Sequence, residues 1–161
     1  MDNQASYTSI PIPLASYRSS SSSHPVARIH GSSAAVCVDI RPQVLILDDC
    51  RFIAERLARA FEAKGYDATI AADGYAGLAM TQDRRFDLVV IDIELPFIGG
   101  FKFVSHLRLD PLHYDAQVLM LAAERSEADR LRAFEIGCSG YLTKPLQIGP
   151  LNAMIDSLAD R

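Results

Sequence analysis

Short apolar runs recur along the chain from residue 44 onward, and most of them end abruptly in polar residues. Val44-Leu45-Ile46-Leu47 stops at a pair of aspartates, Leu88-Val89-Val90-Ile91 stops at Asp92, and 118–121 is a third run of this kind. Continuous apolar runs of this length are typical of parallel strands that are buried on both faces. Shorter stretches at 67–71 and 141–142 complete a set of five predicted strands.

Helical periodicity fills the intervals between these strands. Apolar residues spaced by three or four positions predict helices over 53–64, 74–81, 101–107, 126–136 and 151–158. Gly65 and Gly137 stop the first and the fourth of these helices. Strands and helices that alternate through short connections require right-handed crossovers and a parallel sheet covered on both faces. The sequence therefore predicts an α/β fold with a doubly wound five-stranded parallel sheet.

The first 42 residues differ from the rest of the chain in composition and periodicity. They contain five consecutive serines, Ser19 to Ser23, and four prolines, and they show no sustained periodicity. Such a segment buries too little apolar surface to offset its ordering entropy. We expect a disordered, serine-rich N-terminal tail over 1–42 and one domain over 43–161. Because no segment follows the last predicted helix, we expect no attached output domain.

The composition excludes several classes of protein. The formal charge is −4, so no basic surface that would hold a nucleic-acid backbone is expected. Cys37, Cys50 and Cys138 are odd in number and widely spaced, which argues against a disulfide framework or a zinc site. Cys50 is expected to be a small packed residue. Since the chain has no apolar run of about 18 residues and no secretion signal, we expect a cytoplasmic protein without a membrane segment.

Three carboxylates stand at predicted strand ends. Asp48 and Asp49 close the first strand and Asp92 closes the third. In a doubly wound sheet the carboxyl ends of the strands form the ligand-binding edge, so these side chains should converge. Carboxylates at close range repel each other unless a cation joins them, and Mg²⁺ prefers such oxygen ligands. Lys144, at the end of the fifth strand, would bring an ammonium to the same edge.

As a set, these motifs resemble the receiver domains of bacterial response regulators. The resemblance rests on Asp48-Asp49, on Asp92 followed by Leu95-Pro96 and Gly99-Gly100, and on Lys144-Pro145, and it spans about 44–159. It implies a flavodoxin-like (CheY-like) fold with strand order 2-1-3-4-5. It also implies a two-component phosphoprotein that takes its phosphoryl group from a histidine kinase or a histidine phosphotransfer protein.

The resemblance assigns roles residue by residue. Asp92 would be the phosphoacceptor and a metal ligand, and Asp49 a direct ligand of Mg²⁺. Asp48 would bind the metal largely through water, and Glu94 would offer its backbone carbonyl. Lys144 would pair with the bound phosphoryl group. Apart from this self-phosphorylation and a slow loss of phosphate to water, no enzymatic activity is implied.

One position departs from the family pattern. Receivers usually carry Thr or Ser at the end of the fourth strand, where this chain has Ala122, followed by Ala123, Glu124 and Arg125. Losing that hydroxyl removes a charge-assisted contact of about 1.5–3 kcal/mol from the phosphorylated state. Tyr141 matches the aromatic switch position, and the small Ala122 suggests that its ring stays inward in both states. Glu94 and Glu124 would flank the path of an attacking water.

Three functions remain open at this point. The first is a phosphorylation switch that signals through a protein surface on the fourth helix, fifth strand and fifth helix, to a partner the sequence does not name. The second is a pseudo-receiver that binds partners without phosphorylation, which Ala122 favours and the intact acidic set opposes. The third is a phosphate shuttle or sink, a role that would tolerate Ala122 best.

Overall fold

The computed structural model describes residues 26–27, 38–39 and 41–160, and the chain divides into two compact units, Met1–Asp39 and Ile40–Arg161. In the first unit, β1 (Val26–Ala27) and β2 (Val38–Asp39) pair as antiparallel two-residue strands. The predicted disordered tail, with its serine run, otherwise lies outside the described residues. That prediction stays untested.

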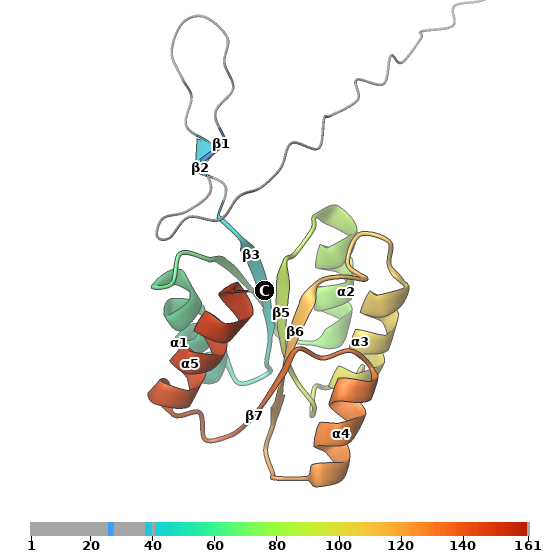
Figure 1. Cartoon of the computed structure of the whole chain (residues 1–161). Coiled ribbons are helices and arrows are strands. Elements are labelled where there is room, and N and C mark those ends of the chain that lie inside the picture. Colours follow the sequence, from blue (N-terminus) through green and yellow to red (C-terminus); the bar gives the residue numbers. More distant parts are fainter. Residues whose placement is uncertain (1–25, 28–37, 40, 161) are drawn as a thin grey trace, which may run out of the picture. The chain divides into compact units, whose positions relative to one another are not determined.

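The second unit is built on one parallel sheet (Figure 1). Its strands are β3 (Gln43–Leu47), β4 (Asp67–Ala71), β5 (Leu88–Asp92), β6 (Gln117–Ala122) and β7 (Gly140–Thr143). They lie in the order β4-β3-β5-β6-β7, and every neighbouring pair is parallel. Counted along this unit the order is 2-1-3-4-5, which confirms the doubly wound, flavodoxin-like prediction.

Helices cover both faces of this sheet. They are α1 (Arg51–Glu62), α2 (Gly74–Asp83), α3 (Gly100–Leu109), α4 (Glu127–Glu135) and α5 (Ile148–Ala159). α1 and α5 lie on one side, and α2, α3 and α4 lie on the other (Figure 1). Alternate residues of each central strand point to opposite faces, so Val44 and Ile46 pack on the α1 side while Leu45 and Leu47 join the other core. The predicted apolar runs therefore fill two hydrophobic cores at once.

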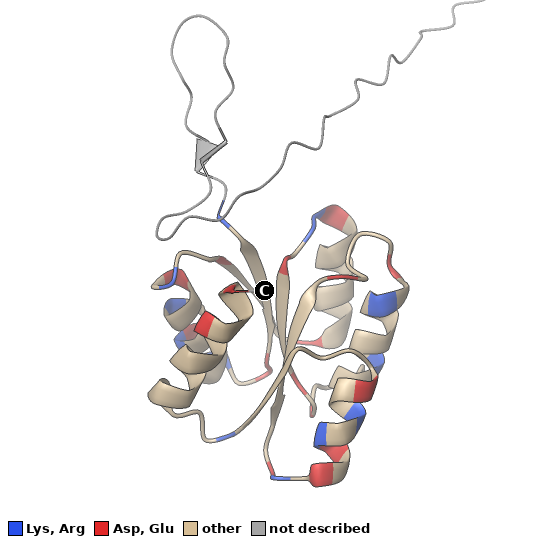
Figure 2. Cartoon of the chain, in the orientation of Figure 1, with Lys and Arg blue, Asp and Glu red and all other residues tan. Residues whose placement is uncertain are grey.

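Local sequence explains where the helices begin and end. The Asp73 side chain accepts a hydrogen bond from the Ala76 amide at 2.8 Å and so caps α2. Ser126 caps α4 in the same way through the Asp129 amide. Gly65, at φ 89°, adopts the left-handed conformation that ends α1 without a steric penalty. Charged residues gather on the helices and loops, whereas the central strands carry them mainly at their ends (Figure 2).

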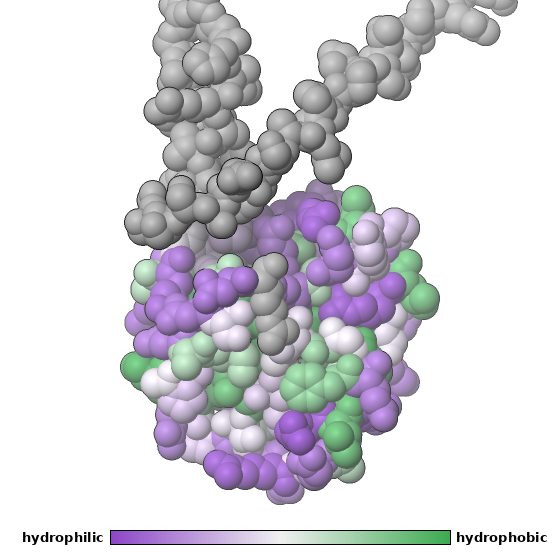
Figure 3. Space-filling model, in the orientation of Figure 1, coloured by the Kyte–Doolittle hydropathy of each residue, from purple (hydrophilic) through white to green (hydrophobic). Residues whose placement is uncertain are grey.

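The exposed face of α4 differs from the usual amphipathic pattern. Ala133 is its only buried residue, whereas Leu131 is 53% and Phe134 44% exposed. The predicted helix is present, but its large apolar side chains do not enter the core. Apolar surface is visible among hydrophilic side chains in the region where Figure 1 places α4 (Figure 3).

A part-buried polar network connects α3 with the segment that leads into β6. The Arg108 guanidinium donates to the carbonyl oxygens of His113, Tyr114, Ala116 and Gly137, the last two at 2.8 and 2.7 Å. Desolvation by burial lowers the pKa of this guanidinium, and it outweighs the opposing effects of Cys138 and Asp115. The buried His113 ring accepts from the Phe86 amide through Nε2 and donates through Nδ1 to Asp110. His113 is thus a structural residue.

Candidate functional site

The functional site lies at the carboxyl edge of the sheet, where three strands deliver polar side chains. Asp48 and Asp49 directly follow β3, Asp92 is the last residue of β5, and Lys144 directly follows β7. β3 and β5 are neighbours, with Leu47 opposite Ile91, so their terminal carboxylates are adjacent by register. The structure therefore brings together the four side chains that the sequence analysis selected.

The three carboxylates form a compact cluster. One oxygen from each of Asp48, Asp49 and Asp92 lies within 4.8 Å of the others. Asp48 and Asp92 are buried, whereas Asp49 is exposed. A cavity of about 320 Å³ borders Asp48 and Asp49 and is also lined by Arg51 and Glu55. A set of oxygen donors with one solvent-facing member fits a hard divalent cation such as Mg²⁺, which keeps part of its water shell.

Lys144 bridges two of these carboxylates. Its Nζ donates to Asp48 Oδ2 at 2.8 Å and to Asp92 Oδ2 at 2.5 Å. Burial lowers the pKa of the Lys144 ammonium, but the hydrogen bonds and the attraction of both carboxylates outweigh burial, so the net shift is upward. Lys144 therefore carries a positive charge at neutral pH and neutralises part of the cluster.

Backbone groups hold the carboxylates in place. The Cys50 amide donates to Asp48 Oδ1 at 2.9 Å, and the Glu94 amide donates to Asp92 Oδ1 at 3.1 Å. Gly100 packs so closely that a Cβ there would lie 2.5 Å from the Asp92 carbonyl oxygen. These supports were not predicted from the sequence, although an aspartate that accepts from the amide two residues later is a common turn pattern. The expectation that Cys50 is packed is wrong, because it lies exposed at the start of α1.

Ala122 occupies the predicted position at the end of β6. It is buried, lies opposite Thr143 of β7, and accepts the Lys144 amide through its carbonyl oxygen at 2.8 Å. The next three residues, 123–125, are exposed and bring no hydroxyl, and the Ser126 hydroxyl is engaged in capping α4. No register shift supplies a hydroxyl here. The carboxylates of Glu94 and Glu124 are exposed.

Tyr141 lies on β7 with its ring against the core on the α3 side of the sheet. Its hydroxyl is buried and has no hydrogen-bond partner among the described residues. Burial raises the pKa of this hydroxyl, and the nearby Asp129 carboxylate raises it further. The hydroxyl of Tyr141 is thus enclosed, although the residue as a whole is only half-buried.

A flavodoxin-like parallel sheet whose carboxyl edge carries three aspartates and a bridging lysine is the arrangement expected of a receiver domain of the two-component type. The family model described as "Response regulator receiver domain" matches residues 44–156. The chain belongs to the response regulator receiver domain family, whose members typically bind Mg²⁺ and are phosphorylated. No helix in the described part of the chain is both long and apolar enough to span a membrane.

Several known proteins resemble this chain. The DNA-binding dual master transcriptional regulator RpaA of Synechocystis is 35% identical over 120 residues, which cover 74% of this chain and 50% of RpaA. The regulatory protein PhoP of Bacillus subtilis is 32% identical over 119 residues, 74% of this chain and 49% of PhoP. The chain thus spans about half the length of the curated relatives it matches.

Solved structures give the same fold. The chemotaxis response regulator CheY4 of Vibrio cholerae matches with a TM-score of 0.69 and 29% identity, over 74% of this chain and 99% of CheY4. The receiver domain of the Francisella response regulator 1452 matches with a TM-score of 0.68 and 31% identity, over 75% of this chain and 98% of that domain. Both alignments cover nearly all of the known domain.

Proposed function

We propose that this chain accepts a phosphoryl group on Asp92, with Mg²⁺ bound at Asp48, Asp49, Asp92 and the Glu94 carbonyl. The donor is a phosphohistidine on a histidine kinase or a histidine phosphotransfer protein, and the proposed location is the cytoplasm. The observation that supports this most is the contact of Lys144 Nζ with both Asp48 and Asp92, inside a cluster of three carboxylates.

The chemistry follows from these positions. An Asp92 carboxylate oxygen attacks phosphorus, the P–N bond of the phosphohistidine breaks, and an acyl phosphate forms as the imidazole leaves with the electron pair. Bound Mg²⁺ supplies charge neutralisation at the phosphoryl oxygens. The Lys144 ammonium pairs with the Asp92 carboxylate before the transfer and with the phosphoryl group on Asp92 after it. Water later cleaves the acyl phosphate, which is the only hydrolysis we propose.

The proposed output is a contact with another protein through the surface of α4, β7 and α5. Leu131 and Phe134, one turn apart on α4, expose large apolar side chains on this surface. Neighbouring exposed apolar side chains of this kind are typical of protein-binding surfaces. The name of RpaA includes DNA binding, but this chain matches only half of RpaA, and DNA binding is not part of the proposed function.

A pseudo-receiver is the second candidate, because Ala122 offers no hydroxyl and the Tyr141 hydroxyl is already buried. In that case the shape of the domain, and not phosphorylation, recruits the partner. A phosphate shuttle or sink also tolerates Ala122, since phosphate transit needs the acidic set, Mg²⁺ and Lys144 but no hydroxyl at position 122. Phosphotransfer kinetics with a competing receiver present separate the shuttle from the switch.

The test is phosphorylation of the purified chain by acetyl phosphate or phosphoramidate with Mg²⁺, read as a mass increase on the intact protein. We expect one phosphoryl group on the wild type, and none on Asp92→Asn or after chelation of Mg²⁺. If Mg²⁺ binds, yet neither small donors nor a phosphohistidine donor label Asp92, the receiver chemistry is wrong and the pseudo-receiver takes its place.

A second variant separates phosphorylation from switching. Ala122→Thr restores a hydroxyl beside Asp92, and in a switch it should increase the amide chemical-shift changes that phosphorylation causes in α4. The wild type should show small changes there if Tyr141 keeps its inward position. Rotation of the Tyr141 ring on phosphorylation of the wild type would contradict the fixed-ring hypothesis.

A further inference from the structure

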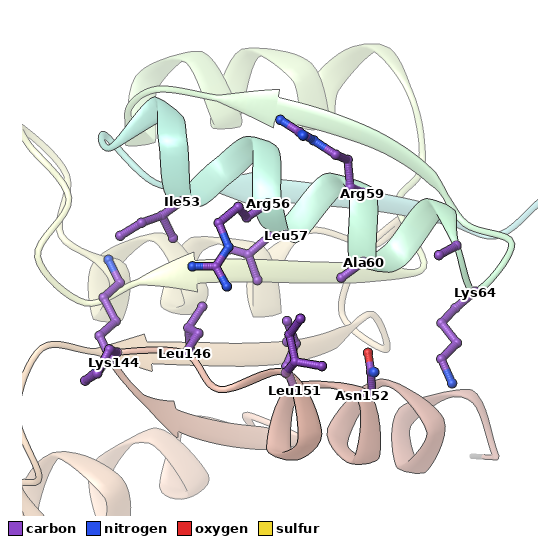
Figure 4. Close-up of a pocket in the computed structure, with 13 residues that line it drawn as sticks. Ile53, Arg56, Leu57, Arg59, Ala60, Lys64, Lys144, Leu146, Leu151 and Asn152 are labelled. Atoms are coloured by element: carbon purple, nitrogen blue, oxygen red, sulfur yellow. The ribbon is translucent and has the colours of Figure 1, made fainter.

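A groove runs between α1 and α5, on the opposite side of the sheet from α4. Its volume is about 410 Å³, within the range of pockets that take small molecules. Apolar side chains line most of it, from α1, from the segment after β7, and from α5: Ile53, Leu57, Ala60, Leu146, Ile148 and Leu151. Figure 4 shows side chains from both helices directed into this space.

The groove combines a buried floor with an uncovered rim. Leu57 and Leu151 are buried beneath it as members of the hydrophobic core on this face of the sheet. Ile148, at the start of α5, is 67% exposed at its edge. An apolar body seated here would contact side chains that are already fixed by core packing, and it would also cover Ile148. Both effects favour binding of apolar surface.

The charged side chains that line the groove are all cationic: Arg56, Arg59, Lys64 and Lys144. Three of them already have carboxylate partners, since Lys64 pairs with Asp156, Arg59 with Glu55, and Lys144 with two aspartates. Arg56 has no carboxylate within ion-pair distance in the described part of the chain, and its guanidinium lies 5.8 Å from the Phe52 ring.

Arg56 and Arg59 point differently. The Arg56 side chain reaches from α1 across the groove toward Leu146, whereas the Arg59 guanidinium turns away from it (Figure 4). The groove therefore presents one available cation above an apolar floor. Its complement is a molecule with one anionic group and one apolar body.

We propose that the α1–α5 groove is a binding site for a small monoanionic amphiphile, such as an apolar carboxylate or sulfonate. The anionic group pairs with Arg56, and the apolar body lies on Leu57 and Leu151 against Ile148. A second copy of the chain is a poorer occupant, because a two-fold contact here would bring the two Arg56 guanidinium groups together without a compensating carboxylate. Lys144 lines the groove, but the proposed contacts with Arg56, Leu57, Leu151 and Ile148 involve no residue of the phosphorylation site.

The experiment uses the full chain and the fluorescent probe 8-anilinonaphthalene-1-sulfonate, which carries one sulfonate on an aromatic body. We expect saturable fluorescence under native conditions and competition by decanoate. Amide chemical shifts of the ¹⁵N-labelled protein should change along α1 and residues 145–152, and not along α3. Shift changes centred elsewhere, or no saturable binding to the folded protein, would overturn the proposal.

Matched variants test the role of Arg56. Arg56→Gln should raise the dissociation constant of the probe about ten-fold or more, through loss of a charge-assisted contact. Arg59→Gln removes the same charge from the same helix but should change the constant by less than about two-fold, because its guanidinium points away. Equal effects of the two variants would refute the site, because only bulk charge would then matter.

A third variant tests the apolar rim. Ile148→Asp places a carboxylate at the edge of the groove, on a residue exposed enough for the fold to survive, and should also weaken the probe about ten-fold. If the same amides instead shift with protein concentration in the absence of probe, the groove is a self-association surface and the proposal is overturned.

Discussion

Lys144→Gln is the substitution that tests the electrostatics of the site most directly. Gln keeps much of the length of the side chain but removes its positive charge. In the wild type that charge lies 2.8 Å from an Asp48 oxygen and 2.5 Å from an Asp92 oxygen. The Lys144 side chain is 17% exposed, and the two carboxylate side chains are 0% and 7% exposed. The variant thus leaves buried carboxylates without a counter-ion.

The structure sets the size of the effect. Two like charges 4.8 Å apart, the limit on the spacing of the three carboxylates, repel by about 3–4 kcal/mol at an effective dielectric constant near 20. Removing one partner of a buried ion pair costs about 3–5 kcal/mol in general. We therefore expect the free energy of unfolding of the metal-free domain to fall by about 3–5 kcal/mol. Mg²⁺ should restore a large part of this loss, because a cation bound to the folded state replaces the missing ammonium.

The assay is urea unfolding of the wild type and the variant, with and without Mg²⁺. With a slope of about 1–3 kcal/mol/M, the metal-free midpoint should fall by at least about 1 M. Lys64→Gln is the matched control, because Lys64 Nζ lies 2.6 Å from Asp156 but the pair is exposed, 36% and 57%. That pair should contribute only about 0–1 kcal/mol. If Lys144→Gln costs no more than Lys64→Gln, or if Mg²⁺ stabilises both variants equally, the reasoning is refuted.

Three further predictions concern the scaffold. Arg108→Met removes the donor to four backbone carbonyls, two of them in part-buried hydrogen bonds, and should cost about 2–4 kcal/mol in urea unfolding. Arg130→Met breaks exposed contacts of similar length and should leave the midpoint almost unchanged. Equal losses in the two variants would contradict this. Burial raises the pKa of the Cys138 thiol to about 12 from an ordinary 9.0, so its neutral form stabilises the fold fully below pH 9.0 and progressively less as the pH rises toward 12. Relative to Cys138→Ala, the wild type should lose about 1.4 kcal/mol between about pH 8 and about pH 10, and parallel pH profiles would argue against it. Gly100→Ala pushes a Cβ against the Asp92 carbonyl and should slow acetyl phosphate labelling roughly 10- to 100-fold. Gly149→Ala, with open space around its Cβ, should leave the labelling rate unchanged. Normal labelling of Gly100→Ala would show that the contact is unimportant.

The fold was predictable because its sheet is buried on both faces. Leu88 to Ile91 are all buried, and this requires a continuous apolar run that is easy to recognise in the sequence. Helix boundaries were less predictable. α1 begins at Arg51, two residues before the predicted start at 53, because Arg51 and Phe52 are exposed and lie outside the apolar periodicity of the helix. Helix α4 shows the opposite failure, since apolar spacing at Leu131 and Phe134 does not correspond to burial.

The convergence of the acidic residues and Lys144 was also predictable, because the carboxyl ends of neighbouring parallel strands meet at one edge. The backbone contacts that hold the site in place were not predictable. Close approach of Gly100 to the Asp92 carbonyl and the donation by the Cys50 amide depend on loop conformations that residue types alone do not specify. The cap that engages Ser126 was visible in part, because Ser before a helix is a common start signal.

The burial pattern of α4 has a mechanical consequence. Ala133, in its last turn, is its only buried residue, and just beyond it the carbonyl of Gly137 is tied to Arg108 while Cys138 enters the core. At the other end, residues 123–125 between β6 and the helix are exposed. The carboxyl end of α4 is therefore anchored to the core, whereas the first turn of the helix has no buried side chain. We expect a displacement of residues 123–125 to move that first turn farthest and to leave both hydrophobic cores intact.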